Sequence, residues 1–314
     1  MARQRKRKGD PVHGWLNLYK PLDMTSTQAV GALKRLYNAQ KVGHGGTLDP
    51  LADGVLPIAF GEATKTVNWA MEADKEYVFT VEWGVSTESQ DKEGAVIATS
   101  DVRPSPEAVG DALKAYVGDI EQVPPKYSAI KVDGARAYDL ARDGEAFELE
   151  RRPVTVYEAE VADAPDAAHV VLRVCCGKGF YVRALARDLA ADLGAEGHVS
   201  QLRRTRVGGF EAANATPLSE IEDMADAAQR LAALAPVQAP LDDVPALPVD
   251  PAEMSQLKQG RAIVLLPHVV EVWRAEQNAE GEGDRLALAL CGDTAVALGE
   301  VRAGRFQPTR VFQI

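Results

Sequence analysis

Hydrophobic and polar positions follow two periods along this chain, one typical of strands and one typical of helices. Residues 76–83, EYVFTVEW, are rich in β-branched and aromatic side chains, which favours a strand. Leu185, Leu189 and Leu193 recur every four positions within residues 180–194, which favours a helix with one apolar face. The same reasoning predicts strands at residues 14–20, 154–161 and 169–176 and helices at residues 26–38 and 105–118.

Two of the predicted helices carry residues that commonly begin and end helices. Thr25 or Ser26 is expected to cap the first of them, since hydroxyl side chains accept hydrogen bonds from free backbone N–H groups. Ser105, followed by a proline, is expected to begin the second, and Gly118 to end it, with Val117 on its apolar face.

The order of these elements predicts the fold class. Strands and helices are interspersed without a regular β–α–β rhythm, which indicates an α+β fold rather than a doubly wound one. Residues 122–153 interrupt the pattern with mixed charge and are interpreted as an insert, and residues 236–250, with four prolines, as a linker. Beyond the linker, five short runs predict a small β-rich domain: residues 263–266, 269–273, 286–290, 295–301 and 309–313.

Charge is distributed unevenly along the chain. The net charge is −11, with −3 on residues 1–210 and −8 on residues 211–314. Basic residues nevertheless gather in two places: an arm (Arg3, Arg5, Lys6, Arg7, Lys8) and a cluster (Arg203, Arg204, Arg206). The arm can be read as a solvated tail or as a phosphate-binding segment. An acidic chain with local basic clusters predicts a localised nucleic-acid footprint.

Composition excludes several other classes of protein. No apolar run is long enough to span a bilayer, and the basic N-terminus lacks the apolar segment of a secretory signal, so we expect a soluble cytoplasmic protein without a membrane partner. Cys175, Cys176 and Cys291 lack metal-ligand spacing, and the histidines do not complement them, so no metal site is expected. No glycine-rich nucleotide-binding motif is present, so no cofactor is expected.

One aspartate stands in an unusual setting, GHGGTLDPLADGVLPIAFG, at residues 43–61. Asp49 follows a Gly-Gly pair and precedes Pro50, which restricts its backbone to extended conformations. A surface turn explains this pattern locally. A carboxylate that must be ionised and held still, as a nucleophile or a base, explains it equally, and it would then need a cationic partner, for which arginine is best suited.

The wider sequence resembles a known family. GGTLDPLADGVLPIAFGEATK is preceded by LNLYKP and followed by DKEYVFTVEWG, then by GDIEQVPPKYSAIKVDGARAYDLARDG, GKGFYVRALARDLAADLG and HVSQLRRTRVGGF. These blocks, in this order across residues 12–210, closely resemble the bacterial TruB family of tRNA pseudouridine synthases. The resemblance implies a mixed, mainly antiparallel central sheet with flanking helices. It also implies an inserted thumb at residues 122–153.

The resemblance also assigns roles to individual residues. Asp49 falls on the family's catalytic aspartate, Arg183 on the arginine that pairs with it, and Tyr77 on the tyrosine that stacks against the flipped uracil. Lys20 matches a lysine that supports the floor of the site, and His44 a histidine that fills the space vacated in the T-loop. Leu202 and the run at residues 55–61 are expected to form apolar walls.

The implied function is isomerisation of uridine-55 in the T-loop of tRNA, by base flipping, aspartate-dependent cleavage of the glycosidic bond and re-attachment through C5. The T-arm of tRNA is the expected partner, with no cofactor and no guide RNA, and we expect a monomer. The implied domains are a basic arm (1–11), a catalytic domain (12–235) and a PUA-like RNA-binding domain (245–314), the last only loosely similar to its family counterpart.

Three questions remain open from the sequence. A non-catalytic tRNA-binding or tRNA-folding protein on the same scaffold would share every binding feature. A glycosidase would need two carboxylates, and Asp53 could be the second. The residues also leave open whether Asp49 attacks the base, attacks the sugar or promotes loss of a ribose proton.

Overall fold

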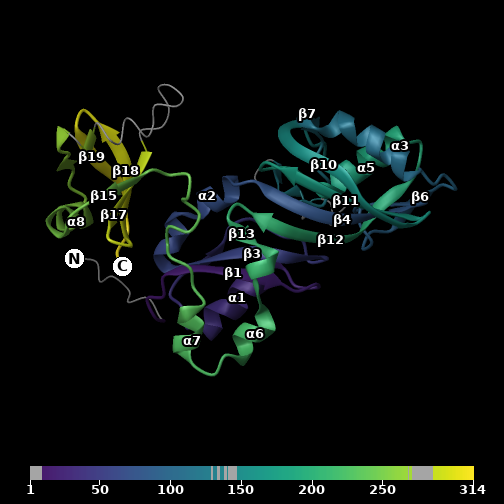
Figure 1. Ribbon diagram of the computed structural model, residues 1–314. Coiled ribbons are helices and arrows are strands. Elements are labelled where there is room, and N and C mark those ends of the chain that lie inside the picture. The colour runs from purple at the N-terminus through teal and green to yellow at the C-terminus, as the bar shows by residue number, and fades with distance from the viewer. Residues whose placement is uncertain are drawn as a thin grey trace.

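The computed structural model describes residues 9–128, 130–132, 135–137, 140, 147–267, 269–270 and 286–314. A ten-stranded sheet forms the centre of the larger part of the molecule, in the order β14-β1-β3-β12-β4-β11-β10-β7, with β2 beside β3 and β13 beside β12 (Figure 1). Among the described strands of this sheet, only the pairs β1–β14 and β3–β12 are parallel. The predicted α+β fold with a mainly antiparallel sheet is therefore confirmed. The strands are β1 (Gly14–Lys20), β2 (Val42–His44), β3 (Ala52–Phe60), β4 (Lys75–Trp83), β7 (Gly118–Gln122), β10 (Arg152–Asp166), β11 (His169–Cys176), β12 (Gly197–Val207), β13 (Phe210–Glu211) and β14 (Thr216–Pro217).

Helices lie on both ends of this sheet. Figure 1 shows α1 and α6 on the β1 side of the sheet, whereas α3 packs against β10 and α5 packs against β12 and β4. The helices are α1 (Ser26–Leu36), α2 (Val67–Glu72), α3 (Pro106–Leu113), α5 (Val182–Asp192), α6 (Leu218–Asp223), α7 (Ala227–Ala232) and α8 (Pro251–Lys258), with short 3-10 helices at Gly61–Lys65, Lys114–Tyr116 and Ala212–Asn214. None of the helices in the described ranges is long and apolar enough to cross a membrane.

The predicted helix caps are confirmed at both helix starts. Thr25 accepts a hydrogen bond from the backbone of Gln28, whose side chain in turn accepts one from the backbone of Thr25. Ser105 accepts a similar hydrogen bond at the start of α3. The predicted end at Gly118 is wrong, because α3 ends at Leu113 and a 3-10 turn leads into β7. Val117 is consequently 44% exposed rather than on an apolar face.

The hydrophobic pattern of the sequence did not predict two central strands, β3 and β12. β3 is buried along almost its whole length, so its residues do not alternate between apolar and polar. β12 carries three arginines and pairs with both β3 and β4. Together these two strands form the middle of the sheet.

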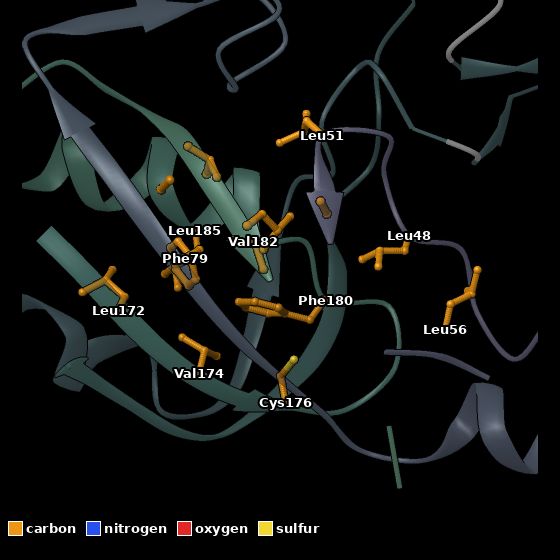
Figure 2. Packing of buried hydrophobic residues seen from close by; sticks show 14 of the residues in the cluster. Leu48, Leu51, Leu56, Phe79, Leu172, Val174, Cys176, Phe180, Val182 and Leu185 are labelled. Atoms are coloured by element: carbon orange, nitrogen blue, oxygen red, sulfur yellow. The ribbon is translucent and has the colours of Figure 1, made fainter. Parts of the chain in front are cut away.

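The main core lies between the sheet and α1, α3 and α5. Leu16, Leu56, Phe79 and Leu185 are all at most 1% exposed. Figure 2 shows this packing, with Phe79 close to Leu185 and with Leu48, Phe180 and Val182 in the same region of the core. Burying each side chain of this size contributes roughly 1.5–3 kcal/mol, so this cluster holds the sheet and helices in one arrangement.

A second sheet forms the C-terminal part, in the order β15-β17-β18-β19-β16. Its strands are β15 (Ala246–Pro248), β16 (Ile263–Val264), β17 (Leu286–Cys291), β18 (Thr294–Arg302) and β19 (Arg305–Val311). Four of the five predicted strand-like runs are confirmed. The fifth, 269–273, is wrong where the structure describes it, since Val269 and Val270 are helical, and its remaining residues lie outside the described part.

The proline-rich segment 236–250 connects the two sheets and is itself packed. Val237 and Leu241 are 4% and 3% exposed and join one apolar cluster with Trp15 from β1 and Phe312 from the C-terminus. The indole N–H of Trp15 donates to the carbonyl of Val237 at 3.2 Å. The apolar surface of the central sheet is thus continuous with that of the C-terminal sheet.

Two predicted segments are described only in part. The basic residues of the arm, 3–8, lie outside the described residues. Within the predicted thumb, 122–153, a two-stranded hairpin of β8 (Lys131–Val132) and β9 (Ala135–Arg136) is described. A further small hairpin joins β5 (Val85–Thr87) to β6 (Val96–Thr99).

Candidate active site

Asp49 lies on the loop at residues 45–51 between β2 and β3, here called the Asp49 loop, and its side chain is 34% exposed. Backbone groups on both sides of it are held by hydrogen bonds from elsewhere in the fold. The amide of Gly45 donates to the carbonyl of Pro57 at 2.8 Å, and the amide of Asp23 donates to the carbonyl of Pro50 at 2.9 Å. Gly46 has φ +120°, a conformation that favours glycine. The loop is therefore pinned while the carboxylate stays accessible.

Helix α1 holds the residue before Asp49. The hydroxyl of Ser26 donates to the carbonyl of Leu48 at 3.0 Å and accepts from its amide at 2.9 Å. Ser26 is 3% exposed, so this pair of bonds is shielded from water. Two adjacent residues at the start of α1 therefore have separate tasks: Thr25 caps the helix, and Ser26 holds the Asp49 loop.

Lys20 lies beneath the loop and is fully buried. Its ammonium group donates to the carbonyls of Pro21 at 2.8 Å, Met24 at 2.7 Å and Pro50 at 3.4 Å. Burial lowers the pKa of Lys20 to about 8, although Asp53 and Asp49 oppose this shift. The structure thus places Lys20 under the loop as a group that binds backbone carbonyls.

Arg183, at the start of α5, contacts Asp49 directly. One terminal nitrogen lies 2.8 Å from the Asp49 carboxylate and also donates to the carbonyl of Tyr127 at 2.9 Å. The other lies 3.3 Å from Asp91 and donates to the carbonyl of Ser89 at 3.1 Å. The side chain of Arg183 is 7% exposed, so its charge acts with little screening. The arginine expected as the partner of Asp49 is in contact with it.

Asp91 is a member of this network that sequence reasoning missed. It is 2% exposed, and its carboxylate accepts from the hydroxyl of Ser89 at 2.5 Å and from the amide of Glu93 at 3.0 Å. It lies in the turn between β5 and β6, in a polar stretch that looks solvated in the sequence. A buried carboxylate is stable only when paired, and Arg183 provides that pair.

Tyr77 points from β4 into a cavity of about 80 Å³ that also contains Asp49. Burial raises the pKa of Tyr77 against the opposing effect of the Arg204 charge, which keeps its phenol protonated at neutral pH. The cavity is lined by Thr47, Leu48, Asp49, Tyr77, Phe180, Val182, Arg183 and Leu202. A carboxylate, a guanidinium and an aromatic ring thus face one small cavity, together with several apolar side chains.

The predicted apolar walls are found only in part. Leu202 lines the cavity and is 7% exposed. Phe180 and Val182, which precede Arg183 in the sequence, line it as well. The run at residues 55–61 is absent from the described lining: residues 55–60 form the buried second part of β3, and Gly61 begins the 3-10 helix that follows. The structure therefore places this run within the sheet, and its role as a wall stays a prediction.

His44 lies at the end of β2, beside rather than inside this cavity. Burial, together with the nearby Arg204 charge, lowers the pKa of His44, which favours the neutral imidazole. Its Nδ1 is buried and has no hydrogen-bond partner among the described residues. His44 therefore has an unused polar group close to the Asp49 loop.

Asp53 cannot act as the second carboxylate of a glycosidase in this arrangement. It accepts two hydrogen bonds from Arg203, at 2.9 and 2.8 Å, and one from Tyr19 at 3.0 Å. Burial alone would raise the pKa of Asp53, but these hydrogen bonds lower the pKa below its ordinary value. Asp53 also does not line the cavity around Asp49.

The cluster expected to bind phosphate, residues 203–206, divides in the structure. The side chain of Arg203 is 53% exposed, although paired with Asp53. Arg206 is partly buried and donates to the sulfur of Cys175 at 3.1 Å. Arg204 is 1% exposed, so its prediction as a phosphate contact is wrong. Successive residues of a strand point to opposite faces, which is why its neighbour is exposed and Arg204 is not.

The described part of the molecule contains further cavities. A larger one, of about 780 Å³, lies between the N-terminal segment, α7 and the C-terminal sheet, and none of the predicted site residues lines it. In the described ranges, no three histidine, cysteine, aspartate or glutamate side chains are grouped so that they could hold a metal ion.

Comparison with known proteins identifies the family. Residues 34–182 match the model of the TruB family pseudouridylate synthase N-terminal domain, and residues 183–244 match that of the tRNA pseudouridylate synthase B C-terminal domain. The fold is thus that of a pseudouridylate synthase. The chain belongs to the TruB family.

Relatives match the chain along its length. It is 56% identical to the tRNA pseudouridine synthase B of Caulobacter vibrioides, with 99% of both chains covered. It is 48% identical to that of Bradyrhizobium diazoefficiens, covering 99% of this chain and 89% of the relative, and 45% identical to that of Rhodospirillum rubrum, covering 99% of both.

Solved structures share the fold at lower sequence identity. A Cbf5-Nop10-Gar1 complex matches with a TM-score of 0.70 and 24% identity, covering 96% of this chain and 85% of the matched chain. An H/ACA RNP bound to a substrate RNA containing 2'-deoxyuridine matches with a TM-score of 0.69 and 21% identity, covering 100% and 92%. At these identities the likeness concerns the fold alone.

Proposed function

We propose that this chain converts uridine-55 in the T-loop of tRNA to pseudouridine. The observation that carries the proposal is the Asp49–Arg183 ion pair of 2.8 Å, held on a pinned loop and facing a cavity that Tyr77 shares. Membership of the TruB family and the full-length similarity to tRNA pseudouridine synthases B support the reaction and the substrate.

The reaction needs a pocket that retains a detached base. The bond from ribose C1′ to uracil N1 breaks, and a bond from C1′ to C5 forms, while C5 loses a proton and N1 gains one. Cleavage depends on the Asp49 carboxylate, whose charge Arg183 stabilises. Tyr77, as a neutral phenol, stacks on the base, and Leu202 and Phe180 exclude water from it. Product and substrate are isomers, so the reaction consumes no oxidant, reductant or group donor.

The uridine must leave the T-loop to reach Asp49. Extruding a nucleotide costs a few kcal/mol of unstacking, which stacking on Tyr77 offsets in part. His44 is our candidate for the group that fills the vacated space, since it lies beside the loop, stays neutral and has a free ring nitrogen. Lys20 supports the floor through the carbonyl of Pro50.

The remaining parts of the proposal concern organisation and partners. We assign residues 1–11 as a basic arm, residues 12–235 as the catalytic domain with a thumb at 122–153, and residues 245–314 as a PUA-like RNA-binding domain. The protein acts as a monomer in the cytoplasm and binds tRNA without a guide RNA. The separate C-terminal sheet supports the division into domains.

The deciding experiment incubates the protein with an unmodified tRNA transcript and maps pseudouridine by carbodiimide block. We expect one block at position 55 with the wild-type protein. The Asp49→Asn variant keeps the side-chain volume and loses the carboxylate, so it should bind tRNA but form no product. Pseudouridine formation by Asp49→Asn within about tenfold of wild type would refute the role of Asp49.

A transcript with cytidine at the target position is the matched control, and it should remain unmodified. A wild-type protein that binds the transcript but leaves uridine unchanged would instead support the alternative of a non-catalytic tRNA-binding protein.

A further inference from the structure

Arg204 is a buried arginine whose setting is not explained by charge pairing. It is 1% exposed and is among the largest fully buried side chains of the described residues. No carboxylate in the described part of the chain forms an ion pair with it, whereas buried Arg183 pairs with both Asp49 and Asp91. Burying a guanidinium without a carboxylate is unfavourable, and a neutral side chain of similar size would be tolerated more easily.

Arg204 donates hydrogen bonds to backbone carbonyls on either side of Asp49. Nε donates to Val55 at 2.8 Å, one terminal nitrogen donates to Thr47 at 3.1 Å, and the other donates to Gly46 at 3.1 Å. The rigid planar fork of arginine thus joins the residues before Asp49 to the strand after it.

The backbone of Arg204 is fixed equally closely. Its strand β12 pairs with β3 at the position Arg204–Gly54. A side chain at Gly54 would place its Cβ 2.2 Å from the carbonyl oxygen of Arg204, and Gly54 has φ +102°, so only glycine fits there. The guanidinium therefore extends from a rigid base toward a loop that it can hold in one position.

We propose that Arg204 is a positioning residue for the reaction of Asp49, which it serves by holding residues 46–55 as one rigid unit. This rests on the proposed function of Asp49. The structure separates the tasks of two arginines: Arg183 contacts the carboxylate itself, and Arg204 contacts the backbone that carries it. A displacement of about 1 Å at a reacting group costs about 100-fold in rate, so removing this clamp should act on the chemical step.

The charge of Arg204 provides a second, independent readout. It contributes, after burial, to lowering the pKa of His44 and of Lys20, and it opposes the raised pKa of Tyr77. Removing the charge should therefore raise the pKa of His44 toward its ordinary value, whereas a change that keeps the charge should not. This difference reports that the charge of Arg204 acts at His44, whereas the rate at saturating tRNA reports whether Arg204 positions Asp49.

The experiment compares Arg204→Met, which removes both charge and fork, with Arg204→Lys, which keeps the charge but cannot bond both segments. We expect the single-turnover rate of pseudouridine formation to fall about 100-fold in both variants. The Kd for tRNA should stay within about threefold of wild type, and the NMR titration of His44 should move upward only in Arg204→Met. If Arg204→Met fails to fold, Arg204→Lys carries the test.

The matched control is Arg230→Met, which removes a partly buried arginine that donates to the carbonyl of Met224 at 2.7 Å, away from the site. Its rate should equal that of wild type. A rate within about threefold of wild type in Arg204→Lys would overturn the proposal, as would a fall in tRNA affinity that accounts for the whole fall in rate. An inactive wild-type protein would refute the proposed function instead, and the His44 titration would still report where the Arg204 charge acts.

Discussion

At the scale of single residues, the site depends on how two charged groups share their partners. The Arg183 guanidinium divides its two ends between Asp49, which is 34% exposed, and Asp91, whose side chain is 3% exposed. The buried carboxylate and two carbonyls hold the guanidinium in place. Of the two carboxylates that contact Arg183, Asp49 is therefore the one that faces the cavity. Such an arrangement orients the Asp49 carboxylate without burying it.

Replacing Arg183 by lysine should reduce activity strongly. A lysine has one nitrogen in place of two separated ones, so it cannot contact Asp49 and Asp91 together. We expect the rate at saturating tRNA to fall by at least about 100-fold, as for other displaced catalytic groups. Single-turnover assays of Arg183→Lys check this, and full activity would show that the arginine serves packing alone.

Lys20 predicts a pH dependence of stability. Its pKa is about 8 in the folded protein and 10.5 as the ordinary value. Between these two pH values the unfolded state binds more protons than the folded state, so the free energy of unfolding should rise with pH across this window. Below pH 8 both states are protonated, and the cost of burying the charge is present in full.

The measurement is urea denaturation of wild type and Lys20→Met from pH 7 to 10. The stability of wild type relative to the variant should increase through this range, because only wild type carries the depressed pKa of Lys20. A constant difference between the two proteins would show that Lys20 titrates normally.

At the scale of elements, the Asp49 loop is positioned by one helix and two strands. The first residue of α1 bonds Leu48, Lys20 at the end of β1 bonds Pro50, and Arg204 of β12 bonds the two residues before Leu48. β1 and α1 precede the loop in the chain, whereas β12 follows it at a long sequence distance. The loop position therefore depends on the assembled sheet.

Ser26→Ala tests this dependence. The change leaves the amide and carbonyl of Leu48 without their partner in a buried place, which costs about 1–3 kcal/mol. We expect lower stability in urea together with a lower single-turnover rate. Thr25→Ala is the control, because it removes only the cap of α1, at about 1 kcal/mol, and leaves Leu48 held. Equal rates in the two variants would show that the loop does not need Ser26.

At the scale of the whole molecule, the C-terminal part differs from the rest of the chain in net charge but packs against it through apolar side chains. The C-terminal sheet shares an apolar cluster with β1 and β3, in which Trp15 and Phe312 are both fully buried. Deleting residues 245–314 would expose this apolar face of the ten-stranded sheet. Such a truncation would therefore measure a loss of stability rather than a loss of RNA binding. Single substitutions that change the charge of a side chain are therefore the appropriate probes of RNA binding by the C-terminal sheet.

We expect the basic arm to bind phosphate groups of tRNA, although the protein as a whole is acidic. Arg204 is buried, so the candidate phosphate contacts are the five basic residues of the arm together with Arg203 and Arg206. Deleting residues 1–8 should weaken tRNA binding and flatten the dependence of log affinity on log salt by about 0.7–0.9 for each phosphate that the arm neutralises.

Affinity measurements at several salt concentrations check this prediction, with the single-turnover rate at saturating tRNA as the measure of chemistry. That rate should persist, since the described residues that line the cavity around Asp49 come from outside the arm. An unchanged slope would place the phosphate contacts elsewhere on the molecule.

The sequence by itself determined the local features of this protein. The caps at Thr25 and Ser105 were predictable because they depend on hydrogen bonds within three residues. The half-exposed strands of the main sheet were predictable because one face meets the core and the other meets water. The Gly-Gly-x-x-Asp-Pro pattern and the ordered family blocks singled out Asp49, Tyr77 and Arg183 before any contact between them was known.

Only the tertiary structure decided which charged residues are buried. Arg203 and Arg204 are neighbours in a basic run, yet the fold around β3 buries one and leaves the other half-exposed. Asp91 is read as a solvated loop residue until Arg183, which follows it by ninety-two positions, is placed beside it. Strand β3 lacks an alternating pattern because neighbours cover both of its faces. Burial depends on what lies across from a residue in space, and that information is spread over the whole chain.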